Sequence, residues 1–102
     1  MEQQKVDYLV RLENGEALIE VQQRQARQET VEQFRNCRKG QCMTQAQLGR
    51  QAGISQPNIT RFESGSYNPS LDFLVKIAAA MGKRVKVTLE DEDGENRGVC
   101  GI

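Results

Sequence analysis

Histidine is absent from this chain, and its three cysteines are too few and too scattered to define a site. Cys37, Cys42 and Cys100 fall in no CxxC spacing, and an odd number of thiols argues against a disulfide framework. Without histidine, a tetrahedral zinc site would need a carboxylate to complete it, which is uncommon for structural zinc. We therefore expect ordinary thiols, no metal and no cofactor.

Long apolar runs are also missing, since no stretch approaches the roughly 18 residues that a membrane-spanning helix needs. Residues 1–10 hold no basic segment followed by an apolar one, so nothing there is typical of an export signal. The 102 residues suit one domain with an arm at each end, and their 37% hydrophobic content is typical of a soluble globular protein. We expect a cytoplasmic protein without membrane contact.

The usual catalytic arrangements are lacking as well. There is no glycine-rich phosphate loop, and no serine or cysteine stands beside a recognisable base, so we expect no enzyme. The acidic run at 90–95 superficially suggests calcium. However, Leu89 occupies the position of the first ligand of an EF-hand loop, which favours a solvated turn or tail.

The formal net charge is zero, but the charges are unevenly distributed. Residues 34–86 carry nine Lys and Arg against two Asp and Glu, whereas residues 1–33 and 87–102 are both acidic. A basic centre is the electrostatic pattern expected of a protein that binds a polyanion. From charge alone, a set of solvated faces is an equally acceptable interpretation.

Hydrophobic periodicity and capping residues predict helices through the centre. Val31, Phe34 and Arg38 recur at helical spacing and predict the first core helix. Thr44 can cap a second helix over about residues 45–51, with a glutamine three residues on as its capping-box partner.

Two further helices are expected after that. Gly53 can take a positive φ in the turn, Ser55 can cap a third helix with Pro57 in its first turn, and Gly65 can end it. Ser70 can cap a fourth helix that stops at Gly82. The expected apolar face of this fourth helix comprises Leu71, Leu74, Val75, Ala78 and Met81.

Two short helices joined by a glycine-containing turn form a helix-turn-helix. If Ile59 and Phe62 face inward on the third helix, its outward row is short and polar and includes Arg61, because residues on a helix lie about 100° apart. This row comprises Pro57, Thr60, Arg61 and Ser64, flanked by Gln56. Arginine and glutamine suit the base edges of a DNA major groove.

With many residues at matching spacings, this sequence resembles the Xre/Cro/C1-type helix-turn-helix regulators, which are related to phage repressors. The resemblance covers about residues 34–89 and rests on Thr44, Gln45, Leu48, Gly53, Ile54, Gln56, Ile59, Phe62, Glu63, Gly65, the Asn68–Leu71 run, Met81 and Gly82. It implies a mainly α, phage-repressor-like bundle of four to five helices. Cys42 stands where relatives carry glycine, which leaves the geometry of that loop open.

The resemblance also implies site residues. The expected base-reading residues are Gln56, Pro57, Thr60 and Arg61; the expected phosphate contacts are Thr44, Gln45, Tyr67 and Asn68; and the expected structural ion pair is Arg38 with Glu63. Proline at position 57 departs from the usual polar residue and offers only van der Waals contact. For Tyr67 and Asn68 a simple turn with a packed ring is an equally good interpretation.

The flanks predict a small β element. Val85, Val87 and Leu89 alternate with polar residues and predict a C-terminal strand, which needs a partner from the other end of the chain or from another subunit. Upstream, residues 6–12 alternate before Asn14 and Gly15, a hairpin signal, and Ala17, Ile19 and Val21 follow. We favour a hairpin over a helix there. The predicted organisation is an N-terminal arm (1–25), a helix-turn-helix domain (26–83), and a strand with an acidic tail (84–102).

A compact helix-turn-helix with such flanks resembles the HigA-type antitoxins, which repress their own operon and bind a toxin. Because plain regulators share the tail, a stand-alone small repressor remains the alternative, and a protein-interaction adaptor on the same fold is a third. The repressor interpretations imply a homodimer on double-stranded operator DNA, since one recognition helix reads one half-site. An antitoxin would in addition have a small toxin protein as partner.

Overall fold

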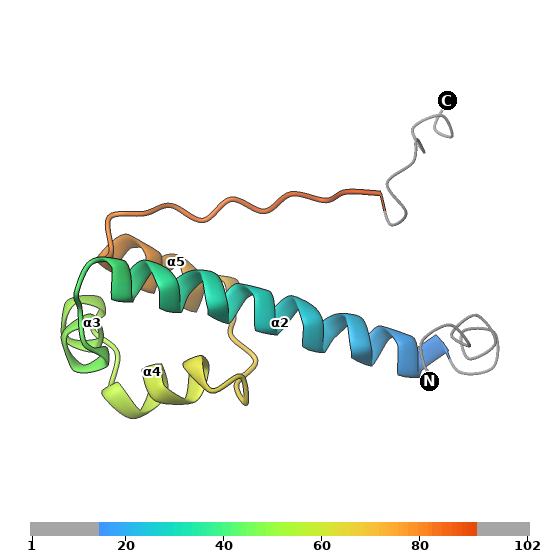
Figure 1. The fold of residues 1–102 in the computed structure, drawn as a ribbon, viewed down its shortest axis with the longest axis horizontal. Coiled ribbons are helices and arrows are strands. Elements are labelled where there is room, and N and C mark those ends of the chain that lie inside the picture. Colours follow the sequence, from blue (N-terminus) through green and yellow to red (C-terminus); the bar gives the residue numbers. More distant parts are fainter. Residues whose placement is uncertain (1–14, 92–102) are drawn as a thin grey trace.

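The computed structural model describes residues 15–91, with side chains from residue 18 onward. The described chain consists of α2 (Gly15–Gly40), α3 (Gln45–Ala52), α4 (Gln56–Glu63) and α5 (Leu71–Ala80). The three short helices pack around the C-terminal half of α2, and the N-terminal half of α2 projects beyond them (Figure 1). The mainly helical fold with a central helix-turn-helix is as expected. None of the described helices is long and apolar enough to cross a membrane.

The predicted N-terminal hairpin is wrong over its described part. Ala17, Ile19 and Val21 lie in α2, which runs unbroken from Gly15 to Gly40. The segment around them is rich in Glu, Gln, Ala and Arg, which are strong helix formers and outweigh an alternation of three positions. The proposed first strand at 6–12 lies outside the described residues.

The predicted C-terminal strand at 85–89 is also not formed within the described chain. After α5 the backbone runs back above α2 toward its N-terminal end (Figure 1), without regular secondary structure. A strand requires a neighbouring backbone to exchange hydrogen bonds with, and α2 has already used its own internally. The expected β element is therefore missing from residues 15–91.

Capping explains where the short helices begin. The Thr44 hydroxyl accepts a hydrogen bond from the backbone N–H of Gln47 at 3.0 Å, and the Gln47 side chain accepts one from the Thr44 N–H at 2.8 Å. Ser70 caps α5 by accepting from the Phe73 N–H at 3.0 Å. Ser55 occupies the N-cap of α4 without a side-chain hydrogen bond. Cys42, at φ 56°, takes the left-handed conformation that explains why glycine is usual there.

The core lies where the four described helices meet. Its largest fully buried side chains are Leu48, Ile59, Phe62 and Ile77. Edge-to-face ring contacts run from Phe34 to Phe62 at 5.6 Å, from Phe62 to Phe73 at 5.4 Å, and from Phe73 to Tyr67 at 5.1 Å. These contacts tie α2, α4 and α5 together through one central phenylalanine.

The expected apolar face of α5 is only half correct. Ala78 and Met81 are buried as expected, but Leu71 and Val75 remain 55% and 49% exposed, and Ile77 is fully buried instead. The buried stripe is rotated toward Phe73 and Ile77, because the rings of Phe62 and Tyr67 pack there. An apolar strip is thus left on the surface of α5.

Gly49 sets how closely α3 approaches the turn that follows it. A Cβ atom built on Gly49 would lie 2.6 Å from the backbone oxygen of Ile54, closer than such atoms approach. The obstacle is main chain, which cannot rotate away as a side chain can. The angle between α3 and α4 therefore depends on the missing side chain at this position.

We expect Gly49→Ala to lower the free energy of unfolding by about 1–3 kcal/mol, as overpacking a close contact does. Gly40→Ala is the matched control, since a Cβ there meets nothing within 4 Å. It should leave the protein unchanged or stabilise it by about 0.5–1 kcal/mol. Urea denaturation followed by circular dichroism measures both, and equal stabilities for the two variants would contradict the close approach.

Candidate nucleic-acid interface

A buried ion pair lies directly behind the helix-turn-helix. Arg38 of α2 and Glu63, the last residue of α4, are 8% and 5% exposed. The Arg38 guanidinium donates from Nε to Oε2 of Glu63 at 2.7 Å and from Nη2 to Oε1 at 2.8 Å. Arg38 also donates from Nη1 to the backbone carbonyl of Met43 at 2.8 Å. One side chain thereby connects α2, the α2–α3 loop and α4.

The charges of this pair stabilise each other. Burial by itself would raise the pKa of Glu63, but hydrogen bonds from Arg38 and Gln45, together with the charges of Arg38 and Arg35, lower this pKa below its usual value. The hydrogen bond to Glu63 raises the pKa of Arg38 in turn, against the effect of its own burial. Both side chains are therefore charged at neutral pH.

A chain of hydrogen bonds connects this pair to the surface of α4. Gln45 donates from Nε2 to Oε1 of Glu63 at 3.0 Å, and its own Oε1 accepts from the Thr60 hydroxyl at 2.7 Å. Gln45 is the first residue of α3, and Thr60 is exposed on α4. The structure thus brings together two residues that the sequence assigned to different roles, phosphate contact and base reading.

The outward face of α4 is a shallow, exposed hollow. It is lined by Gln56, Pro57, Thr60, Arg61 and Ser64, the row expected from the sequence. The opposite side of α4 carries Ile59 and Phe62, both fully buried. The helix is thereby held by its apolar face, and its polar face is left to solvent.

Arg61 is held along this face by two neighbours. Its guanidinium donates to the Asn58 side-chain oxygen and lies over the Tyr67 ring, 5.9 Å from the ring centre. The structure therefore places Tyr67, an expected phosphate contact, beside Arg61, an expected base-reading residue. Asn58 had not been predicted, although its spacing of three residues from Arg61 on one helix is a recognisable signal.

The two other expected phosphate contacts at the surface are exposed. Asn68 lies in the loop between α4 and α5, and Thr44 lies at the start of α3.

Arg35 is a second residue that had not been predicted. Its Nη2 donates to the backbone carbonyl of Glu63, and its Nε lies 3.9 Å from the Glu63 carboxylate. Arg35 precedes Arg38 by three residues and so shares its face of α2, which is the signal that would have found it. Its side chain is about one-third exposed and adds positive charge at the C-terminal end of α4.

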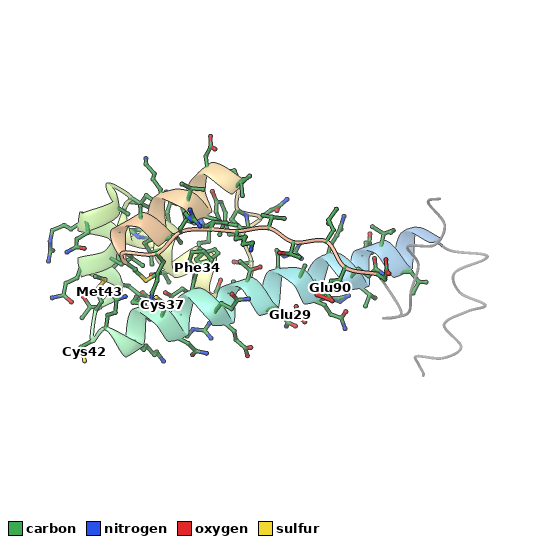
Figure 2. The ribbon with its side chains drawn as sticks, turned by 90° about the horizontal axis from the view of Figure 1, so that it is seen from above. Glu29, Phe34, Cys37, Cys42, Met43 and Glu90 are labelled. Carbon is green, nitrogen blue, oxygen red and sulfur yellow. The ribbon has the colours of Figure 1, made fainter. Side chains whose placement is uncertain are left out.

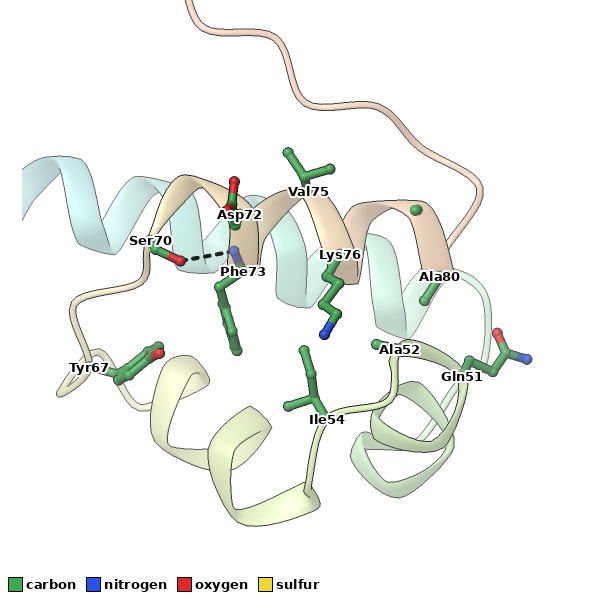
Figure 3. Close-up of a pocket in the computed structure, with 11 residues that line it drawn as sticks. Gln51, Ala52, Ile54, Tyr67, Ser70, Asp72, Phe73, Val75, Lys76 and Ala80 are labelled. Carbon is green, nitrogen blue, oxygen red and sulfur yellow. Dashed lines mark hydrogen bonds between the residues drawn. The ribbon is translucent and has the colours of Figure 1, made fainter.

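A separate cavity lies between α5 and the turn from α3 to α4. Ile54 and Phe73 point into it, Lys76 lies at its edge, and Tyr67 closes one end (Figure 3). It is open, and its lining includes the titratable residues Tyr67, Asp72 and Lys76. In the described part of the chain no group of three or more His, Cys, Asp or Glu residues is placed to hold a metal ion. The exposed face of α4 is the better candidate site.

This geometry is that of a helix-turn-helix with an exposed second helix. Residues 34–86 match the protein-family model HTH_3, described as Helix-turn-helix. The chain belongs to this family of Xre/Cro/C1-type helix-turn-helix proteins.

Curated relatives carry the same domain. A protein of Methanothermobacter thermautotrophicus, named as an uncharacterized HTH-type transcriptional regulator, is 36% identical over 63 residues, which are 60% of this chain and 91% of that protein. A protein of the same description from Haemophilus influenzae is 40% identical over 45 residues, 44% of this chain. The match spans only 46% of the length of the Haemophilus protein.

A solved structure shares more of the chain. It is titled "Toxin-Antitoxin module from Streptococcus pneumoniae" and is 31% identical in sequence. The superposition covers 89% of this chain and 97% of the other, with a TM-score of 0.50. The likeness therefore extends beyond the helix-turn-helix to most of the chain.

We expect Glu63→Gln to lower the free energy of unfolding at pH 7 by about 3 kcal/mol, because it leaves the Arg38 charge buried without a partner. The pKa of Glu63 is lower in the folded than in the unfolded protein. Its contribution is therefore complete above the unfolded value of about 4.3 and is lost as the pH falls through the folded value. The stability difference between wild type and variant should shrink below about pH 4.

Urea denaturation at pH 7 and at pH 3 measures this difference. Glu32→Gln is the control, since Glu32 is exposed on α2 and its neutralisation should change stability by less than about 0.5 kcal/mol at either pH. A Glu63→Gln difference of the same size at both pH values would contradict the charged pair.

Proposed function

We propose that this protein is a sequence-specific, double-stranded DNA-binding transcriptional repressor, and that it is the antitoxin of a type II toxin–antitoxin pair that represses its own operon. The observation that carries the DNA-binding part is the exposed polar face of α4, presented by a helix whose other face is fully buried. This arrangement lets one helix enter a major groove while the rest of the domain stays rigid. The activity is that of a cytoplasmic binding protein rather than of an enzyme.

Base reading falls to the residues at the start and centre of the α4 face. Gln56 and Arg61 have the hydrogen-bonding groups that pair with adenine and guanine edges, respectively. Thr60 can contact either kind of base, and Pro57 offers van der Waals contact to a thymine methyl group. Arg61 leaves Asn58 and Tyr67 when it turns toward DNA, and both of these neighbours are part-exposed.

Phosphate contacts would flank that face. The Thr44 hydroxyl accepts the cap hydrogen bond and can still donate its proton outward. Gln45 stands at the N-terminus of α3, where the helix dipole favours a phosphate. Tyr67 and Asn68 would provide the contact on the other side of α4. The net positive charge of residues 34–86 suits binding to the negatively charged phosphate backbone of DNA.

The antitoxin part of the proposal rests on the likeness to the Streptococcus toxin–antitoxin module over most of the chain. The N-terminal half of α2, which projects beyond the core, is more than a minimal DNA-binding unit requires (Figure 1). A stand-alone repressor is the alternative. It is favoured by the names of the curated relatives, which are given only as transcriptional regulators. An adaptor without DNA binding would have no need for Gln56 and Arg61 on the exposed face.

We expect Arg61→Ala to weaken binding to the operator by about 1–3 kcal/mol and to relax the preference at one base position. Gln45→Ala should instead weaken binding to all sequences by similar factors. Fluorescence anisotropy with single-base operator variants and a scrambled duplex separates the two effects. Lys76→Ala is the matched control, since it removes one exposed positive charge from α5, away from the α4 face.

Equal losses on operator and scrambled DNA for Arg61→Ala would remove Arg61 from base reading. Since Gln45 also bonds to Glu63 and Thr60, a thermal melt of each variant is needed. A loss of DNA affinity is assigned to the lost DNA contact only when the variant keeps the melting temperature of the wild type.

The antitoxin assignment has its own test. We expect the protein, expressed from its native operon with a tag, to co-purify with a small basic protein encoded next to it. Growth arrest on expression of that neighbour alone, relieved by co-expression of this chain, would support the pair. If no neighbour co-purifies and none arrests growth, the chain is a stand-alone repressor.

A further inference from the structure

A continuous line of hydrogen bonds runs from the buried ion pair to the exposed hydroxyl of Thr60. The Glu63 carboxylate accepts from Arg38 through both of its oxygens, and its Oε1 also accepts from Nε2 of Gln45 at 3.0 Å. Oε1 of Gln45 in turn accepts from the Thr60 hydroxyl at 2.7 Å. Thr60 is exposed and lines the hollow on the outward face of α4. A buried charge is thus connected, bond by bond, to a group at the surface.

The line is anchored at the end of α2 from which α3 follows. Arg38 donates from Nη1 to the carbonyl of Met43 at 2.8 Å, so all three nitrogens of its guanidinium are hydrogen-bonded. Figure 2 shows Met43 at this end of α2, and Glu29 well along the helix toward its N-terminus. Because Arg38 is held at three points, the two oxygens of the Glu63 carboxylate are fixed in place as well.

The chemistry of the groups fixes the direction of each bond. The two-fold contact with Arg38 keeps Glu63 charged, and a carboxylate only accepts hydrogen bonds. The part of the Gln45 amide that faces Glu63 is therefore its NH2 group, and the amide oxygen faces Thr60. Since an amide oxygen also only accepts, the Thr60 hydroxyl is the donor. Its single proton is directed toward Gln45.

This direction limits what Thr60 offers to a ligand. A hydroxyl has one proton to donate and two lone pairs that accept. With the proton committed to Gln45, only the lone pairs are left for a partner on the exposed side. In a major groove the amino groups of adenine and cytosine are donors, whereas O6 and N7 of guanine and O4 of thymine are acceptors. An accepting hydroxyl oxygen attracts the amino groups and is unfavourable opposite a keto oxygen.

We propose that Thr60 reads the amino group of a base, so that the operator carries adenine or cytosine at the position that Thr60 faces, and that Gln45 sets this preference. The inference rests on the proposed DNA binding and narrows it. A threonine alone can contact either kind of base. Hydrogen-bonded to Gln45, it separates amino bases (adenine, cytosine) from keto bases (guanine, thymine) without separating the members of each class. Gln45 acts on the base through Thr60 and is a positioning residue in this readout.

The same orientation suits the phosphate contact proposed for Gln45. An amide NH2 group carries two protons, and Glu63 accepts one of them. The other can donate to a phosphate oxygen without any rotation of the amide. One amide, held in one orientation, would then serve a phosphate directly and a base through Thr60.

The base preference is tested on duplexes from the protein's own promoter that carry each of the four base pairs at every position. Each change is made in both half-sites, because the proposed homodimer reads both. At one position we expect wild type to bind adenine and cytosine within about threefold of each other, and guanine and thymine about tenfold more weakly. Thr60→Val, which keeps the shape and loses the hydroxyl, should reduce this amino-over-keto ratio to less than about threefold. Fluorescence anisotropy measures the affinities.

Two variants serve as controls for Thr60→Val. Thr60→Ser keeps a hydroxyl at the same position and should retain the amino-over-keto ratio. Thr30→Val makes the matched substitution on α2, where Thr30 follows Glu29 and donates to the Ala26 carbonyl. It should leave the ratio unchanged.

Gln45→Ala tests the positioning role. It removes the acceptor of the Thr60 proton, so the freed hydroxyl can donate as well as accept. We expect the amino-over-keto ratio at this position to fall below about threefold, in addition to the similar loss on every duplex that follows from the missing phosphate contact. A thermal melt confirms that the variant is folded. A uniform loss with the ratio retained would contradict the positioning role of Gln45.

The outcomes separate this inference from the proposed function. A preference for guanine or thymine at the position that Thr60→Val affects, or base preferences that Thr60→Val changes nowhere, would overturn the amino readout and leave the proposed function standing. A protein without base preference at any position of its promoter would contradict the proposed function, and the amino readout with it.

Discussion

The buried pair of Arg38 and Glu63 is the interaction on which the rest of the domain depends. It joins the long helix α2 to the last residue of α4, and Arg38 also holds the carbonyl of Met43 in the preceding loop. Burying two charges is costly, and it is tolerated here because both carboxylate oxygens and three guanidinium nitrogens are hydrogen-bonded. An apolar replacement could fill the same space. It could not set the orientation of α4 through two directed bonds.

The side-chain amide of Gln45 connects the buried ion pair to the exposed face of α4, because it forms hydrogen bonds with both Glu63 and Thr60. The N-terminus of α3 and the exposed face of α4 therefore move as one body. Sequence-specific binding benefits from such rigidity, since phosphate contacts fix the register in which side chains meet the bases. The core rings around Phe62 hold the opposite face of α4 in place. The exposed face of α4 is thus held in place by the buried ion pair on one side and by aromatic packing on the other.

Much of the fold could be predicted from the sequence, because local signals decided it. Thr44 and Ser70 cap their helices as capping patterns predict, and Gly53 takes its positive φ. Two predictions failed for the described residues, the N-terminal hairpin and the C-terminal strand. In the first the local signal was short, and in the second a pairing strand was missing from residues 15–91. The alternation through Ile19 and Val21 was outweighed by helix-forming neighbours, and residues 85–89 have no strand to pair with among residues 15–91. The bonds of Gln45 to Glu63 and Thr60 depend on how two helices meet, which spacing in one helix does not encode.

The central claim is that the α4 face reads DNA sequence. Its most direct measurement is a fluorescence-anisotropy titration of the purified protein on a duplex from its own promoter and on a scrambled duplex, at two salt concentrations. If the α4 face reads DNA sequence, the protein should bind tightly and salt-sensitively and prefer the promoter by about a hundredfold or more. Equal affinity for both duplexes, or no binding to either, would contradict it.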